Sequence, residues 1–260
     1  MSQKQNYIFF TLATLVSVAL RTAMLFFTID TKSGFLKTEY LFFGGAILAV
    51  IALAAVLTFV FSYLAKPQFD PETPKNRVFR LCTALLALVI LYDTFFTNIA
   101  SNAVSWQKAT EAVLAIIAAV ALIVFAAKDE DSTPLPPVLN VVPVLYWFIR
   151  LIIVFANIST LANIPDNIFE LVSLCLILIS ALWCAKVACI GIEEKRRGLL
   201  SAILMTTVFS CFVTAIPRGI AILSGNEALL HKTGIPIMTT LVAGVYFLVF
   251  ALSNLLKKTN

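Results

Sequence analysis

Eight long apolar segments follow one another along the chain, separated by short polar stretches. They lie near residues 7–29, 40–64, 78–98, 107–127, 138–160, 168–190, 198–223 and 235–256. A helix needs roughly 20 apolar residues to cross a bilayer core of about 30 Å. Strands of a membrane barrel would instead alternate with a period of two, which these segments do not do. We therefore predict an all-α, polytopic membrane bundle of eight transmembrane helices.

The amino-acid composition also indicates a membrane environment. Hydrophobic residues make up 60% of the chain and charged residues 13%, with a mean hydropathy of +0.97. A soluble domain is roughly 45–50% apolar and about 25% charged. The excess apolar surface must therefore face lipid, and the loops are too short for a separate soluble domain. The first segment is preceded by Lys4, as in a signal peptide, but it is about 23 residues long, carries Arg21 and lacks an A-x-A cleavage site. We expect it to be retained.

The basic residues between the segments predict the orientation. Ten lie at the two chain ends or follow the second, fourth and sixth segments: Lys4, Lys66, Lys75, Arg77, Lys128, Lys195, Arg196, Arg197, Lys257 and Lys258. Four lie in the opposite loops: Lys32, Lys37, Lys108 and Lys232. Cytoplasmic loops carry the excess of Lys and Arg, so we expect a cell-membrane protein with both termini cytoplasmic. The net charge of +5 is then mostly this bias and indicates no nucleic-acid partner.

Residues that support metal or redox chemistry are scarce. The five cysteines all fall inside apolar segments without a Cys-x-x-Cys pair, and the one histidine, His231, lies in a predicted loop. Free cysteines of this kind are usually small apolar packing residues. We expect no metal site and no cofactor. Acid–base catalysis also lacks its usual groups, so we do not expect an enzyme.

Two halves of the chain share a weak pattern. Arg21 precedes Glu39 by 18 residues, and Arg150 precedes Glu170 by 20. A basic cluster follows each time, "PKNRVFRL" and then "EEKRRGLL". We predict two tandem four-helix units, residues 1–130 and 131–260, joined by the acidic and Pro-rich stretch 128–137. Because each unit has an even number of helices, the repeat would be parallel.

Polar residues recur at spacings of three and four in the odd-numbered segments, which places them on one helix face. The stripe at 138–160 contains Asn140, Pro143, Trp147, Arg150 and Asn157. The sixth segment adds Glu170, Ser173 and Ser180. We expect the odd-numbered helices to line the centre. The second, fourth and eighth segments carry small residues, such as Gly44, Gly45, Ala115 and Ala119, and are expected to face lipid more.

Arginines within apolar segments need a polar environment, because an Arg at the centre of a membrane helix costs about 2.5–3.5 kcal/mol. With the amino end inside, most of these charges fall in the outer part of the membrane. We predict three ion pairs: Arg21–Glu39, Arg150–Glu170 and Asp93–Arg218. Such pairs can fix the register of helices. The guanidinium groups can also bind an anion, since their fork matches carboxylate and phosphate. The predicted ligand-binding residues are Arg21, Arg150, Arg218, Asp93, Glu39, Glu170 and Asn157.

Arg21 followed by "DTKSGF", with Arg150 followed by "NISTLANIPDNIFEL", resembles uncharacterised multi-pass membrane proteins of clostridial bacteria. The resemblance implies a bacterial membrane protein and no particular activity. Two functions remain open. One is a transporter-like protein that binds or carries a small anionic solute in an outward-facing cavity lined by Arg. The other is a non-catalytic membrane subunit of assembly, sensory or immunity type, which contacts a membrane protein partner and whose charges are structural.

Overall fold

The chain folds into an all-α bundle. The computed structural model describes residues 3–30, 35–65, 74, 76–99, 106–127, 136–158, 165–226 and 237–255. Eight α-helices lie within these ranges: α1 (Gln3–Phe27), α2 (Leu41–Leu64), α3 (Arg77–Ile99), α4 (Trp106–Ala127), α5 (Pro137–Ile158), α6 (Pro165–Ile190), α7 (Arg197–Leu223) and α8 (Ile237–Leu255). Short 3-10 turns, Thr38–Tyr40 and Glu194–Arg196, precede α2 and α7.

Local sequence signals account for several helix ends. Proline is the first residue of α5 and α6, a position where its missing N–H costs nothing. The end of α7 is closed by Gly225, which has a φ of 73°. There the amide of Asn226 donates to the carbonyl of Ala221, and the amide of Gly225 donates to that of Ile222. This pair of bonds is the Schellman ending, which favours glycine at the left-handed position.

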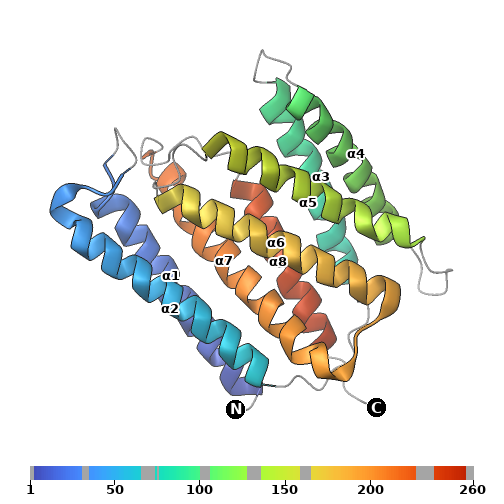
Figure 1. Ribbon diagram of the computed structural model, residues 1–260, viewed down its shortest axis with the longest axis horizontal. Coiled ribbons are helices and arrows are strands. Elements are labelled where there is room, and N and C mark those ends of the chain that lie inside the picture. The colour runs from blue at the N-terminus through green and yellow to red at the C-terminus, as the bar shows by residue number, and fades with distance from the viewer. Residues whose placement is uncertain are drawn as a thin grey trace.

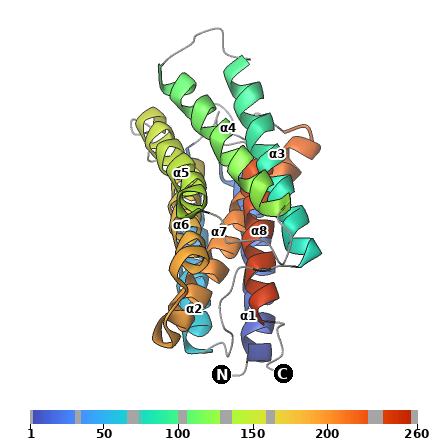
Figure 2. The same cartoon turned by 90° about the vertical axis from the view of Figure 1, so that its right-hand side faces the viewer.

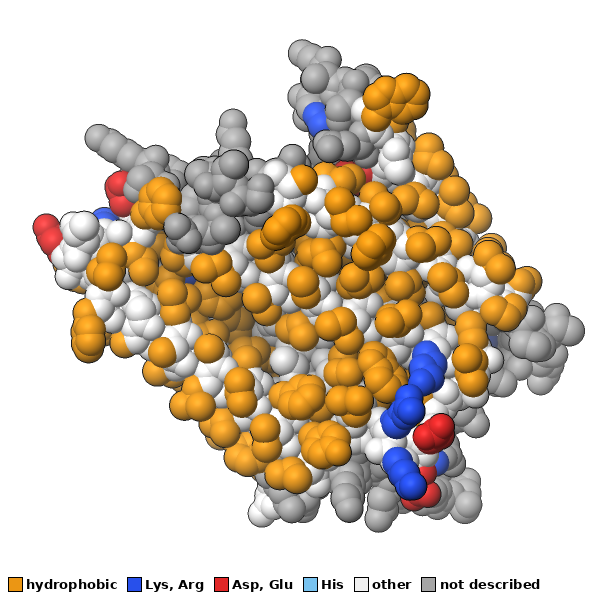
Figure 3. Space-filling model, in the orientation of Figure 1, with side chains coloured by type: hydrophobic (Ala, Val, Ile, Leu, Met, Phe, Trp, Pro, Cys, Tyr) orange, Lys and Arg blue, Asp and Glu red, His pale blue; other side chains and the backbone are white. Residues whose placement is uncertain are grey.

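Helix lengths and surface chemistry show an integral membrane protein. Seven helices in the described part of the chain are long and apolar enough to cross a membrane, and α8 is a shorter apolar helix. At 1.5 Å per residue, the 19 residues of α8 span about 28 Å, close to the thickness of a bilayer core. Figure 3 shows hydrophobic side chains over most of one face, with Lys and Arg gathered near the end of α6. α1 begins and α8 ends at the same end of the bundle, which fits an even number of crossings (Figures 1 and 2).

Six of the helices form a closed ring. Around it, α3 packs on α4, α4 on α5, α5 on α6, α6 on α7, α7 on α8, and α8 on α3. α1 and α2 pack on α7 from outside the ring, so α7 has neighbours on both sides and most of its residues are buried (Figure 1). These contacts make α7 the central helix.

The expected helix roles are partly confirmed. The stripe residues of α3 (Thr83, Leu86, Ile90, Asp93) and of α7 (Thr207, Cys211, Thr214, Arg218) are all buried. α2 exposes many large apolar side chains, as expected of a lipid-facing helix. The expectation for α8 is wrong, because it packs between α7 and α3 and only Met238 among its described residues is a large, exposed apolar side chain. The expectation that every odd-numbered helix lines the centre is wrong for α1, which packs on α7 from outside the ring.

The helix contacts offer no evidence for the repeat. α1 and α2 pack on α7, whereas α3 and α4 pack on α8 and α5. The helices of the predicted unit 1–130 are therefore in two places, separated by helices of the unit 131–260. Most of the predicted linker 128–137 lies outside the described residues. The two-unit division stays a prediction.

Candidate functional site

Seven charged side chains are buried in the described part of the bundle. They are Arg21, Asp93, Glu111, Arg150, Asp166, Glu170 and Arg218, each with 5% or less of its surface exposed. All lie in the same half, at the end opposite to the start of α1. None is more than eight residues from its helix terminus at that end, about 12 Å along the axis. The charges therefore cluster in one half of the bundle, which we refer to as the charged half. Their position relative to the membrane stays a prediction.

Asp166 joins three helices. Its Oδ1 accepts a hydrogen bond of 2.7 Å from Nη2 of Arg21 on α1. From α7, Arg218 donates Nε to Oδ1 and Nη2 to Oδ2, at 3.1 and 2.8 Å. The Arg21 guanidinium also lies 4.2 Å from the centre of the Phe169 ring, at cation–π distance. Charge-assisted bonds of this geometry are the strong ones, so Asp166 ties α1, α6 and α7 together.

The contact between α6 and α7 continues as a row of polar pairs. Nη2 of Arg218 reaches Oε2 of Glu170 at 3.1 Å. One turn further along, the hydroxyl of Ser173 lies 2.7 Å from that of Thr214. The hydroxyls of Ser180 and Thr207 lie 2.6 Å apart. The polar stripes predicted on the sixth and seventh segments therefore face each other, and they hold α6 and α7 in one register.

Arg150 forms a second group inside the ring. It makes an ion pair with Glu111 of α4. It also interacts electrostatically with Asp93 of α3 and Glu170 of α6. The Arg150 guanidinium is thus surrounded by carboxyl groups from three other helices. Glu170 also bonds to Arg218 and so connects the residues around Arg150 to those around Asp166.

Two of the predicted ion pairs are wrong. Glu39 is exposed in the turn before α2, and Arg21 pairs with Asp166 instead. Arg218 pairs with Asp166 and Glu170 rather than with Asp93, which faces Arg150. Exposed Glu39 can keep its hydration, whereas a buried Arg needs a partner within the bundle.

The third pair, Arg150–Glu170, is close in space, but the direct partner of Arg150 is Glu111. Asn157 lies in the last turn of α5, and its side chain is outside the described residues. Ligand binding by the predicted residues stays a prediction.

Asp166 and Glu111 were missed by sequence reasoning. Asp166 lies just before the predicted sixth segment, near 168–190, and Pro165 starts α6 early enough to place it in the first turn of the helix. Asp166 and Glu170 are four residues apart and so share a helix face. Glu111 is the one acidic residue in the segment 107–127, which we expected to face lipid. A search for every carboxylate inside an apolar segment would have found both.

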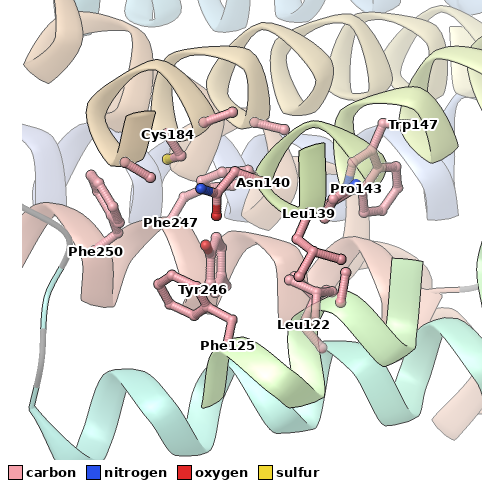
Figure 4. Close-up of a pocket in the computed structure, with 15 residues that line it drawn as sticks. Leu122, Phe125, Leu139, Asn140, Pro143, Trp147, Cys184, Tyr246, Phe247 and Phe250 are labelled. Atoms are coloured by element: carbon pink, nitrogen blue, oxygen red, sulfur yellow. The ribbon is translucent and has the colours of Figure 1, made fainter. Parts of the chain in front are cut away.

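A small cavity lies inside the ring in the other half of the bundle. Figure 4 shows its lining side chains, which come from α3, α4, α5, α6 and α8. Its walls are mostly apolar, with Asn140 and Tyr246 as polar groups, and its volume is about 60 Å³. Asn140, Pro143 and Trp147 line it from α5, as the predicted stripe on that segment requires. This cavity lies near the end where α5 begins, and none of its lining residues is an arginine. The outward-facing cavity lined by Arg stays a prediction.

No cluster of three or more His, Cys, Asp or Glu side chains in the described ranges has the arrangement of a metal site. No protein family model, no curated protein and no solved structure matches the chain. The resemblance to clostridial membrane proteins is therefore supported only as far as a multi-pass helical membrane architecture. Any inference about function therefore depends on the buried charged residues.

Proposed function

We propose that the protein is a non-catalytic membrane carrier for a small solute with an anionic group, and that Arg150 binds this group inside the six-helix ring. The observation that carries the proposal is the continuity of one face of α5. Asn140, Pro143 and Trp147 line the cavity on this face. Arg150 is three residues beyond Trp147 and therefore lies on the same face of α5. It is the member of the charged half that lies nearest to the middle of the bundle. The ring interior thus runs from an apolar cavity to a guanidinium.

Arg150 is a better anion site than the other two buried arginines. Arg21 and Arg218 converge on Asp166, whose carboxylate receives four guanidinium hydrogen bonds from them. Releasing either arginine would leave Asp166 under-compensated in a buried position, at a cost of several kcal/mol. Arg150 pairs directly with one carboxylate, that of Glu111 on a neighbouring helix. An anionic solute can replace this carboxylate when Glu111 takes up a proton, because a neutral Glu111 leaves no uncompensated buried charge. The guanidinium fork would hold a carboxylate or phosphate through two oxygens.

The cavity limits the size of the solute in this conformation. Drug-sized ligands occupy pockets of roughly 300–1,000 Å³, several times the cavity volume. A solute of a few heavy atoms, or a conformation in which α5 moves away from α8, is therefore required. Pro143 is part of the cavity wall and lies within α5, where it removes one helical hydrogen bond. This is the place where α5 can bend most easily.

A second function is favoured by the Asp166 group. Its arginines and carboxylate are closely paired across α1, α6 and α7, as expected of charges that fix helix register. If all seven buried charges act in this way, the protein is a non-catalytic membrane subunit that works through contacts with a protein partner. The response of Arg150 to anions separates the two functions.

The test uses purified protein in detergent and measures its thermal unfolding with acetate, lactate, phosphate, sulfate or glycine. A ligand that binds the folded form alone raises the apparent stability. We expect at least one of these solutes to raise the unfolding temperature of the parent protein. Arg150→Gln should abolish the increase and Arg150→Lys should weaken it, because Lys keeps the charge without the fork.

Arg196→Gln, at an exposed residue, is the matched control and should respond like the parent. An unresponsive parent protein, or a folded Arg150→Gln protein with the full response, refutes the carrier proposal. Arg150→Lys keeps the test decisive if Arg150→Gln does not fold.

A further inference from the structure

The contact between Glu170 and Arg218 uses only one atom of each charged group. Both side chains are almost completely buried, with 0% and 1% of their surface exposed. Nη2 of Arg218 donates to Oε2 of Glu170 at 3.1 Å. The other two atoms, Nη1 of Arg218 and Oε1 of Glu170, have no hydrogen-bond partner in the described part of the chain. A buried polar atom without a partner is costly, so each of them indicates a place for a further polar group.

The free donor and the free acceptor lie close to each other. Nη1 and Oε1 are attached to the same carbon atoms as the two bonded atoms, Nη2 and Oε2, which are in direct contact. Asp166 occupies the edge of the guanidinium that Nε and Nη2 form. Nη1 is directed away from that edge, because the guanidinium is planar and its donors have fixed directions. Asp166 therefore leaves Nη1 available for another acceptor.

Glu170 also lies beside the residue that we propose to bind the anion. Its helix, α6, packs between α5 and α7. From α7 it is contacted by Arg218, and from α5 it interacts electrostatically with Arg150. A solute whose anionic group is held by Arg150 therefore has Glu170 as a neighbour. A second polar group of the same solute can then reach Oε1 of Glu170 and Nη1 of Arg218.

We propose that the solute is a small 2-hydroxy carboxylate, whose hydroxyl group donates to Oε1 of Glu170 and accepts from Nη1 of Arg218 while its carboxylate binds Arg150. This inference rests on the proposed carrier function and names its solute. A hydroxyl group donates and accepts at the same time, as this pair of atoms requires. An ammonium group can donate to Oε1 but cannot accept from Nη1, and a methyl group can do neither.

Water has the same two hydrogen-bonding functions and can bridge the same two atoms. A solute that lacks the hydroxyl would displace such a water and leave both protein atoms unpaired, which lowers its affinity. A site built to hydrogen-bond a hydroxyl group rejects the analogue without it for this reason. Glu170 therefore determines specificity for the hydroxyl group, whereas Arg150 binds the charge.

The test compares glycolate, propionate and glycine as ligands of the purified protein in detergent. Propionate has as many heavy atoms as glycolate, with a methyl group in place of the hydroxyl. Thermal unfolding is measured over a range of concentrations of each solute, and the increase in unfolding temperature gives the apparent affinity. We expect glycolate to bind roughly tenfold more tightly than propionate, because its hydroxyl bonds to charged groups. Glycine should bind more weakly than glycolate.

Glu170→Gln should remove the preference for glycolate. The oxygen of the new amide would turn toward Nη2 of Arg218, which places its NH₂ group where Oε1 was. The site then has two donors and no acceptor for the hydroxyl, so glycolate and propionate should bind equally. Arg218 keeps its bonds to Asp166, which supports folding of the variant. Glu194→Gln, at an exposed residue, is the matched control and should keep the preference.

The comparison on the parent protein is decisive even if Glu170→Gln does not fold. Equal affinities for glycolate and propionate overturn the inference, because water alone would then bridge the two atoms. A higher affinity for glycine than for glycolate overturns it as well, and so does a Glu170→Gln protein that still prefers glycolate. Equal affinities that are lost in Arg150→Gln leave the carrier function standing. A parent protein that responds to none of the solutes refutes the carrier function and this inference together.

Discussion

Arg218 holds Asp166 through two nitrogens, with Nε 3.1 Å from Oδ1 and Nη2 2.8 Å from Oδ2. The two residues are 52 positions apart in the chain, at the end of α7 and the start of α6. Both are almost completely buried. The pair therefore fixes where two neighbouring membrane helices meet, and Arg21 extends the same connection to α1. A structural role for this group and a binding role for Arg150 can be tested separately.

Asp166→Asn should destabilise the bundle. The change leaves Arg21 and Arg218 buried with less negative charge than they need, and breaking a buried pair in this way costs about 3–5 kcal/mol. Unfolding of the purified protein in detergent, followed by circular dichroism against denaturant, measures the loss. Glu193→Gln is the control, because Glu193 pairs with Arg196 at 3.6 Å on the exposed surface. Equal stability of the two variants would show that Asp166 is not a structural centre.

Thr214→Val should weaken the contact between α6 and α7. The hydroxyl of Thr214 lies 2.7 Å from that of Ser173, and Val has nearly the same shape. Hydrogen bonds between membrane helices average about 0.6 kcal/mol, with a maximum near 1.7. We expect a loss in this range. Thr11→Val removes an exposed hydroxyl that bonds only within α1, and it should have less effect in the same unfolding assay.

Gly244→Ala should destabilise the contact between α7 and α8. A Cβ atom at Gly244 would lie 2.8 Å from the Cβ atom of Cys211, which is closer than two carbon atoms can approach. Overpacking of this kind costs about 1–3 kcal/mol. Gly45→Ala, on α2, meets no atom within 4 Å, and a gain in helix propensity should leave it neutral or more stable. Thermal unfolding of both variants checks the difference, and a stable Gly244→Ala protein would show that the helices are less tightly packed than described.

Labelling of single cysteines tests the orientation, which rests on the distribution of Lys and Arg. In a background without native cysteines, Ser2→Cys and Glu130→Cys should be protected from a membrane-impermeant reagent in intact cells. Gly34→Cys and Asn226→Cys should react, because these residues belong to the loops with few basic residues. Labelling at position 130 from outside would contradict cytoplasmic termini.

The sequence by itself was sufficient to predict the membrane helices and the burial of Arg21, Arg150 and Arg218. These follow from local chemistry: helix length must match the bilayer, and an arginine within an apolar segment has to turn toward the bundle interior. The polar face of α7 was also predictable, since Thr207, Cys211, Thr214 and Arg218 repeat at helical spacing.

Only the tertiary structure decided which charges meet. Arg21 pairs with Asp166, 145 positions away, and not with the nearer Glu39. Helical periodicity specifies the face on which a side chain lies, but not the helix that packs against that face. The neighbours of α7 are determined by the packing of the whole bundle, in which α1 and α2 lie outside the six-helix ring. That packing brings four carboxyl groups and three arginines from six helices together, and this grouping cannot be read from any one segment.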